Sequence, residues 1–160
     1  MSGTATFIKM PITELDGLRT AATPKRSFFG KPKDSFHDFL SEHGENVADY
    51  KWSGYVLATL LPYLEQRQKI NLMKSEYDDL SSFLSHIRKA TYFIFTNAHK
   101  QSYIGKLSEG FSESELSDFY NEFNATNEPE SGKPMVDGIR ALYLSLAAVD
   151  ENSVVIFGIE

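Results

Sequence analysis

The side chains best suited to catalysis or metal binding are scattered through this sequence and form no known motif. No two of the four histidines have the four-residue spacing that would place both on one helix face to bind zinc. The glycines form no phosphate-binding loop, no serine stands in a nucleophile elbow, and there is no cysteine. We therefore predict no catalytic residue, no metal and no cofactor. The histidines are His37, His43, His86 and His99.

The acidic side chains, in contrast, are concentrated in one segment. Residues 107–132 contain seven carboxylates and neither lysine nor arginine, so this segment carries a charge of −7. The whole chain has a net charge of −6, which leaves +1 for the remainder. The segment lacks the D-x-[DN]-x-[DN]-G pattern of a calcium-binding loop. This asymmetry favours a surface that binds a basic partner.

We predict that this surface lies on a helix beginning near Ser112. Ser112 and Glu115 have the spacing of a capping box, and an apolar stripe follows at Leu116, Phe119, Tyr120 and Phe123. Most of the acidic residues lie off this stripe and should face water or a partner. Aromatic side chains exposed among them would act as anchors, and the candidates are Phe111, Phe119 and Tyr120. The predicted contact residues are Glu109, Glu113, Glu115, Asp118, Tyr120, Glu122, Glu128 and Glu130. The alternative is an acidic face that only keeps the protein in solution.

Length and composition indicate one globular domain that covers residues 1–160. Of the 160 residues, 41% are hydrophobic and 13% aromatic, which is enough for a packed core. The negative charge argues against a nucleic-acid partner. The start of the sequence shows no signal peptide, and no apolar run is long enough to span a membrane. Together with the lack of cysteine, this leads us to expect a cytoplasmic location.

Two predicted strands enclose a series of helices. Residues 4–10 are rich in β-branched and apolar side chains, and residues 153–159 form a continuous apolar run typical of a strand covered on both faces. We expect these two strands to pair in a small sheet. The predicted fold is therefore α+β, helix-rich, with a sheet that pairs the N- and C-terminal strands.

Periodic apolar residues and capping residues predict the helices between these strands. Pro62 lies within one of them and should kink or divide it. The tract 24–33 contains two prolines, one glycine and four basic residues and should be a loop, as should residues 124–134. The expected helices follow Pro11, run from Asp34 to Gly44, cover Asp49–Asn71, begin at Ser112, and cover Met135–Val149.

The longest predicted helix covers Ser75–Lys100. Its apolar residues alternate at spacings of three and four over the whole length, as on one face of an amphipathic helix. Such a helix would pack on the core or pair with a second copy in a coiled coil. The β-prone cluster Tyr92–Phe95 would, however, end the helix early.

Three stretches together resemble the family of bacterial proteins called domain of unknown function 1877, or YfbM-like. They are Phe7 to Pro11 with the helix that follows, residues 49–61 with Lys51 and Trp52, and residues 138–159. The likeness covers under half of the chain; Lys51 and Trp52 are adjacent where the family has a residue between them, and residues 75–130 show nothing of the family. The resemblance implies an α+β fold with paired terminal strands and supplies no catalytic residue. By analogy, some small acidic bacterial proteins are encoded beside toxins as immunity proteins.

We therefore expect a bacterial immunity protein, or a similar inhibitor, that neutralises a basic toxin or effector through its acidic helix. In this interpretation the chain is not an enzyme, and it is a monomer or homodimer. One alternative is a small-molecule-binding protein or enzyme, with His86 or His99 beside a carboxylate in a pocket. The other is an oligomerisation module built on the Ser75–Lys100 helix.

Overall fold

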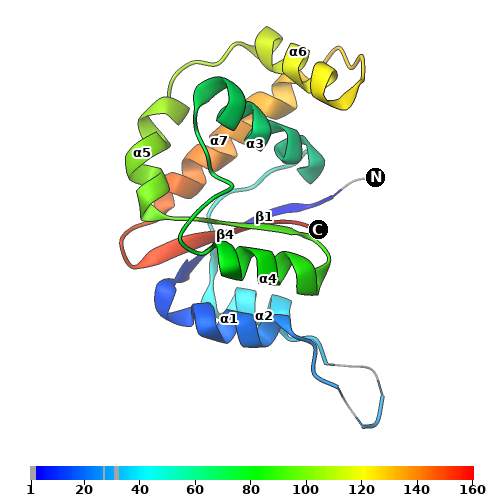
Figure 1. Ribbon diagram of the computed structural model, residues 1–160, viewed down its shortest axis with the longest axis vertical. Helices are drawn as coiled ribbons and strands as arrows, with labels where there is room; N and C mark the ends of the chain where they lie inside the picture. Colours follow the sequence, from blue (N-terminus) through cyan, green and yellow to red (C-terminus); the bar gives the residue numbers. More distant parts are fainter. Residues whose placement is uncertain (1–2, 27, 31–32) are drawn as a thin grey trace.

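A four-stranded antiparallel sheet lies at the centre of the computed structural model, which describes residues 3–26, 28–30 and 33–160 (Figure 1). The strand order is β2-β1-β4-β3. The predicted α+β class and the pairing of the two terminal strands are confirmed. The strands are β1 (Ala5–Pro11), β2 (Glu45–Asn46), β3 (Thr91–Phe95) and β4 (Ser153–Ile159).

Strand β4 lies inside the sheet, between β1 and β3. It pairs with β1 from Ala5↔Ile159 to Pro11↔Ser153, and its other edge pairs with β3. All seven of its residues are buried, as the continuous apolar run predicted. The sheet is therefore covered on both faces at β4, and alternate residues of β1, β3 and β4 reach separate cores.

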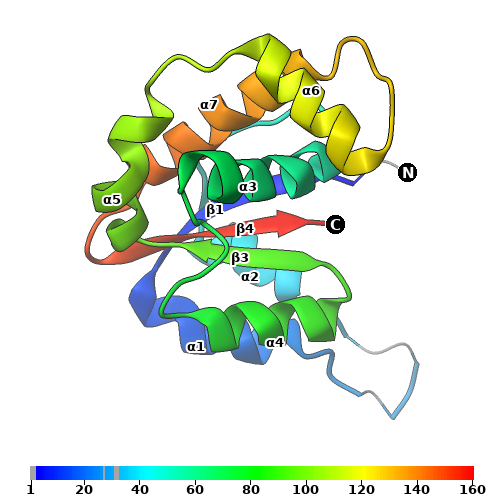
Figure 2. The ribbon, with the colours of Figure 1, turned by 45° about the horizontal axis from the view of Figure 1, so that its top comes forward.

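Helices form a layer on each face of the sheet (Figure 2). Phe7, Phe95 and Phe157 face a core shared with α3, α5, α6 and α7, and the Phe157 ring lies 5.1 and 5.4 Å from the other two ring centres. Met10 and Ile156 face a second core shared with α1, α2 and α4. The helices are α1 (Leu15–Ala22, after a 3₁₀ turn at Ile12–Glu14), α2 (Phe36–His43), α3 (Gly54–Gln68), α4 (Asp78–Arg88), α5 (Asn97–Leu107), α6 (Glu113–Asn124) and α7 (Gly132–Ala148).

The predicted helix Ser75–Lys100 is wrong: the structure divides this stretch into α4, β3 and α5. Lys89 adopts the left-handed conformation with φ 54° and ends α4. The aromatic and β-branched residues that follow gain more by pairing with β4 than by continuing an amphipathic helix, so tertiary pairing overrides the periodic pattern. The long helix on which an oligomerisation module was to rest is therefore absent from this fully described stretch.

Helix α3 also differs from its prediction. It begins at Gly54, where the Ser53 hydroxyl accepts a hydrogen bond from the Tyr55 N–H, so residues 49–53 precede the helix. Pro62 lies inside α3 without dividing it. The hydrogen bond that Pro62 cannot make would go to the carbonyl of Ala58, which is an exposed residue of the helix.

The predicted loop at 24–33 joins α1 to α2. Lys25 and Lys33 form an isolated antiparallel bridge at its base, while positions 27, 31 and 32 lie outside the described residues. Asp34 was predicted to cap α2, and its Oδ1 accepts the N–H of Phe36 at 3.1 Å. The same carboxylate accepts two hydrogen bonds from the Arg88 guanidinium, at 3.0 and 2.7 Å, which holds the pKa of Asp34 below its usual range.

No helix in the described part of the chain is long and apolar enough to span a bilayer.

Candidate partner-binding site

All seven carboxylates of the acidic segment are exposed. Glu109 lies before α6, and the other six lie on α6 or on the connection from α6 to α7. Figure 1 places α6 at the opposite end of the molecule from α1 and α2. We call these six residues the acidic surface: Glu113, Glu115, Asp118, Glu122, Glu128 and Glu130. Glu109 stands apart, beside Phe111 on a different hollow.

None of these carboxylates lies in an ion pair with a cation of the described residues. The side chain of Glu115 has one polar contact, because its Oε1 accepts a hydrogen bond from the Tyr63 hydroxyl at 3.4 Å. Uncompensated like charges that lie near one another create a negative potential in the surrounding water. The acidic surface is therefore open to a cationic partner.

Local interactions explain why α6 forms where it does. The Ser112 hydroxyl accepts the N–H of Glu115 at 3.2 Å, which is one half of the predicted capping box. Glu113 and Glu115 lie in the first turn, where a negative charge is favourable to the helix dipole. These two glutamates therefore stabilise the helix as well as contributing to the acidic surface.

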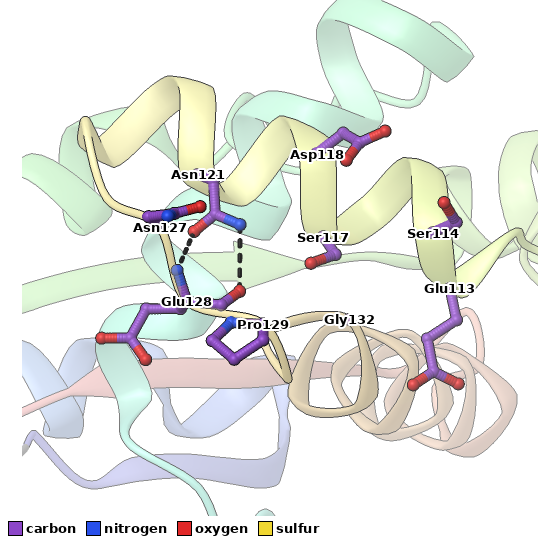
Figure 3. A pocket seen from close by; sticks show the side chains of 9 residues that line it. All are labelled: Glu113, Ser114, Ser117, Asp118, Asn121, Asn127, Glu128, Pro129 and Gly132. Carbon is purple, nitrogen blue, oxygen red and sulfur yellow. Dashed lines mark hydrogen bonds between the residues drawn. The ribbon is translucent and has the colours of Figure 1, made fainter.

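The connection after α6 is held firmly to the helix. Asn121 accepts the Glu128 N–H at 2.8 Å and donates to the Glu128 carbonyl at 3.0 Å (Figure 3). Its Oδ1 also accepts a hydrogen bond from the Thr126 hydroxyl at 2.9 Å. Ser131, which is buried, contacts the Ser117 hydroxyl at 2.8 Å and donates to the Glu128 carbonyl at 3.1 Å. The glutamates of this connection therefore stand on a pre-ordered backbone.

A polar hollow of about 510 Å³ lies between α6 and the start of α7. In Figure 3 the carboxylates of Glu113, Asp118 and Glu128 point away from one another and do not converge on one point. Among the described residues, no group of three or more His, Asp or Glu side chains could hold a metal ion. This arrangement suits contact with a protein surface better than the binding of a single small ion. The lining residues are Glu113, Ser114, Ser117, Asp118, Asn121, Asn127, Glu128, Pro129 and Gly132.

Gly132 allows the first turns of α6 and α7 to approach closely. A Cβ atom at this position would lie 2.4 Å from the carbonyl oxygen of Glu113, which is closer than real contacts allow. Glycine is therefore required where α7 begins.

A second, smaller hollow lies on the other side of Glu128. It has a volume of about 240 Å³ and is lined by Trp52, Val56, Tyr120, Glu128, Glu130, Ser131 and Pro134. We call it the aromatic–acidic hollow. The predicted helix Asp49–Asn71 included Trp52, which instead lies before α3. Trp52 fits the four-residue apolar spacing with Val56 and Leu60, and the contrary signal is the polar stretch Asp49–Ser53 around it.

The predicted anchors differ in exposure. Tyr120 and Phe111 are half-buried, and each leaves part of its ring at the surface. Phe119 is wrong as an anchor, because it is only 7% exposed and its ring packs edge-on against Tyr63 at 5.1 Å. Phe123 is 49% exposed and stacks on Phe119.

Neither His86 nor His99, the histidines considered for a catalytic pocket, forms an ion pair with a carboxylate of the described residues. His86 is exposed, whereas His99 is buried, with backbone groups of Thr96 and Lys74 at its two ring nitrogens. The Nδ1 of His99 accepts the Thr96 N–H at 3.0 Å, and its Nε2 lies 2.6 Å from the Lys74 carbonyl, so Nε2 carries the proton. Burial lowers the pKa of His99 and favours this neutral form. His99 lies in the first turn of α5 and forms a capping box with Thr96, the residue between β3 and this helix.

Comparisons with family models, curated proteins and solved structures find no match to this chain. The resemblance to domain of unknown function 1877 therefore stays a prediction.

Proposed function

We propose that this chain is a protein-binding inhibitor of the immunity-protein kind, which captures a basic toxin or effector through the acidic surface. The observation that carries the proposal is that all six carboxylates of this surface are exposed and unpaired among the described residues. Complementary charge accelerates association and selects partners. The pre-ordered connection at Asn121 supports the proposal, because a rigid surface loses little conformational entropy on binding.

The test is a charge reversal that leaves the fold intact. Asp118 and Glu122 lie on α6, are exposed, and their side chains have no hydrogen bond within the described chain, so Asp118→Lys with Glu122→Lys should not disturb packing. The control, Glu76→Lys with Glu151→Lys, makes the same change of charge at exposed positions away from α6. Tagged parent and variants are used to capture basic proteins from the native host at low and moderate salt.

We expect one basic partner to be retained by the parent and the control but lost with the α6 variant. For the isolated partner, association with the α6 variant should be about tenfold slower or more. Higher salt should weaken capture by the parent. Equal association rates for the two double variants would contradict the proposal.

A second candidate is binding of a small apolar molecule, and a different hollow favours it. This hollow has a volume of about 510 Å³ and lies between α7 and the α5–α6 connection, with Phe111, Ile139 and Tyr143 in its lining. Its size is within the range of about 300–1,000 Å³ for ligand sites. Ligand screening by thermal shift tests this alternative, since a bound ligand raises the melting temperature.

A further inference from the structure

The aromatic–acidic hollow is too small for a typical small-molecule ligand but large enough for one side chain. Its volume of about 240 Å³ is below the range of about 300–1,000 Å³ for drug-sized ligands. Trp52 and Tyr120 supply aromatic walls, and Glu128 and Glu130 supply negative charge. Aromatic faces beside carboxylates attract a cation by two independent electrostatic effects.

The walls of the hollow are fixed by hydrogen bonds. The Trp52 Nε1–H donates to Asp137 Oδ2 at 2.8 Å, which holds the indole ring against α7. The Tyr50 hydroxyl donates to the Pro134 carbonyl at 2.8 Å and holds the first turn of the same helix. Glu128 is held through Asn121 as described above. A hollow built in this way needs little rearrangement to accept a side chain.

One cation of the chain already uses the indole ring. Lys51 Nζ lies 5.1 Å from the centre of the Trp52 ring, and Lys51 is exposed. The indole therefore has a face within reach of cations in water. Lys51 pairs with no carboxylate in the described structure. A cation that also pairs with a carboxylate can therefore replace it over the indole ring.

We propose that the aromatic–acidic hollow binds an arginine side chain of the partner. A planar guanidinium can stack on an aromatic face while its N–H groups donate to Glu128 and Glu130, which the ammonium of lysine does less well. This inference rests on the proposed function, since it assigns the anchor residue of the same basic partner. It concentrates recognition at one point of the acidic surface.

Trp52 makes the proposal directly measurable, because it is the only tryptophan in the chain. The probe is a capped Gly-Arg-Gly peptide, and the matched control contains citrulline, which has nearly the same shape but no charge. Binding is followed by the indole N–H signal of Trp52 in NMR spectra. We expect the arginine peptide to shift the indole signal saturably. A peptide with lysine in place of arginine should bind more weakly, and the citrulline peptide should cause no shift. No shift with the arginine peptide would overturn the inference.

A pair of variants separates the hollow from the general negative field. Glu130→Gln removes a carboxylate that lines the hollow, whereas Glu122→Gln removes one from the same surface outside it. Both are exposed, and neither side chain makes a described hydrogen bond, so the fold should persist. We expect Glu130→Gln to weaken binding of the arginine peptide about fivefold, and Glu122→Gln to weaken it less than twofold.

The outcomes distinguish this inference from the proposed function. Equal weakening by the two variants would mean that only the diffuse field attracts cations, which overturns the arginine site but leaves the acidic surface as the binding region. Capture of a basic partner that is unaffected by the reversal on α6 overturns the proposed function, whether or not the peptide binds.

Discussion

His99 is the one histidine whose neutral form the fold requires. Its two ring nitrogens join the end of β3 to the segment before α4, one as acceptor from Thr96 and one as donor to Lys74. A proton on Nδ1 would remove the first of these bonds and place a charge among buried groups. His99 therefore stabilises the junction between β3 and α5. This junction lies within the stretch that the apolar spacing predicted as one continuous helix.

We expect His99 to make stability depend on pH. Its pKa is lowered in the folded state, so the unfolded state binds the proton first as the pH falls. The contribution of His99 is complete above about pH 6.5, the pKa of an unperturbed histidine, and is lost progressively as the pH falls toward the folded-state pKa.

Urea unfolding of the parent and of His99→Gln across this pH range provides the measurement. The variant should be less stable at pH 7 by about 1–3 kcal/mol and should lose less stability on acidification. The difference between the two proteins isolates the contribution of His99 from those of the groups that both proteins share. Parallel pH profiles would show that His99 does not titrate as its surroundings imply, and His86→Gln, at an exposed position, should match the parent.

At the scale of elements, the approach of α6 to α7 determines the shape of the acidic surface. Gly132→Ala should destabilise the protein, because the new Cβ would overlap the Glu113 carbonyl and force the two first turns apart. Overpacking of this kind costs about 1–3 kcal/mol. Urea unfolding gives the change in free energy, and binding of the basic partner should weaken as Glu113 and Glu128 move apart.

Gly105→Ala is the matched control. Gly105 lies inside α5, and a Cβ atom there has nothing within 4 Å. This change should stabilise the helix by about 0.5–1 kcal/mol, since alanine is the better helix former. If both substitutions stabilise the protein, the close contact at Gly132 is not a constraint.

The elements differ in how far their sequences reveal them. Strand β4 and helix α6 could be predicted because one is continuously apolar and the other has a cap and a stripe. Strand β3 could not, because its residues also satisfy a helical period and only the presence of β4 decides between the two structures. Pro62 lies inside a continuous α3, and the proline rule alone predicted a kink or a division there.

The candidate site could be predicted only in part. The charge of the segment identified the glutamates, which are local in sequence. The aromatic–acidic hollow joins Trp52 from the segment before α3, Tyr120 from α6 and Glu130 from the connection between α6 and α7. Such a meeting depends on how α3, α6 and α7 pack together, so no spacing in the sequence indicates it.

At the scale of the whole molecule, the position of β4 between β1 and β3 affects how the chain is made. Strand β1 is synthesised long before its main partner, since Ala5 pairs with Ile159. At about 5–20 residues per second, β1 waits on the order of ten seconds on the ribosome with Phe7 and Met10 exposed. Both cores also need β4, because it supplies residues to each.

We therefore expect no stable folding intermediate before β4 is available, and a need for chaperones that shield β1 in the nascent chain. A fragment that ends at Asn152 should show no cooperative urea transition by Trp52 fluorescence, whereas the chain with β4 should show one. A cooperative transition in the fragment would mean that one helical layer folds by itself. Otherwise, the acidic surface takes shape only once β4 has been added, in the same cooperative step that forms both cores.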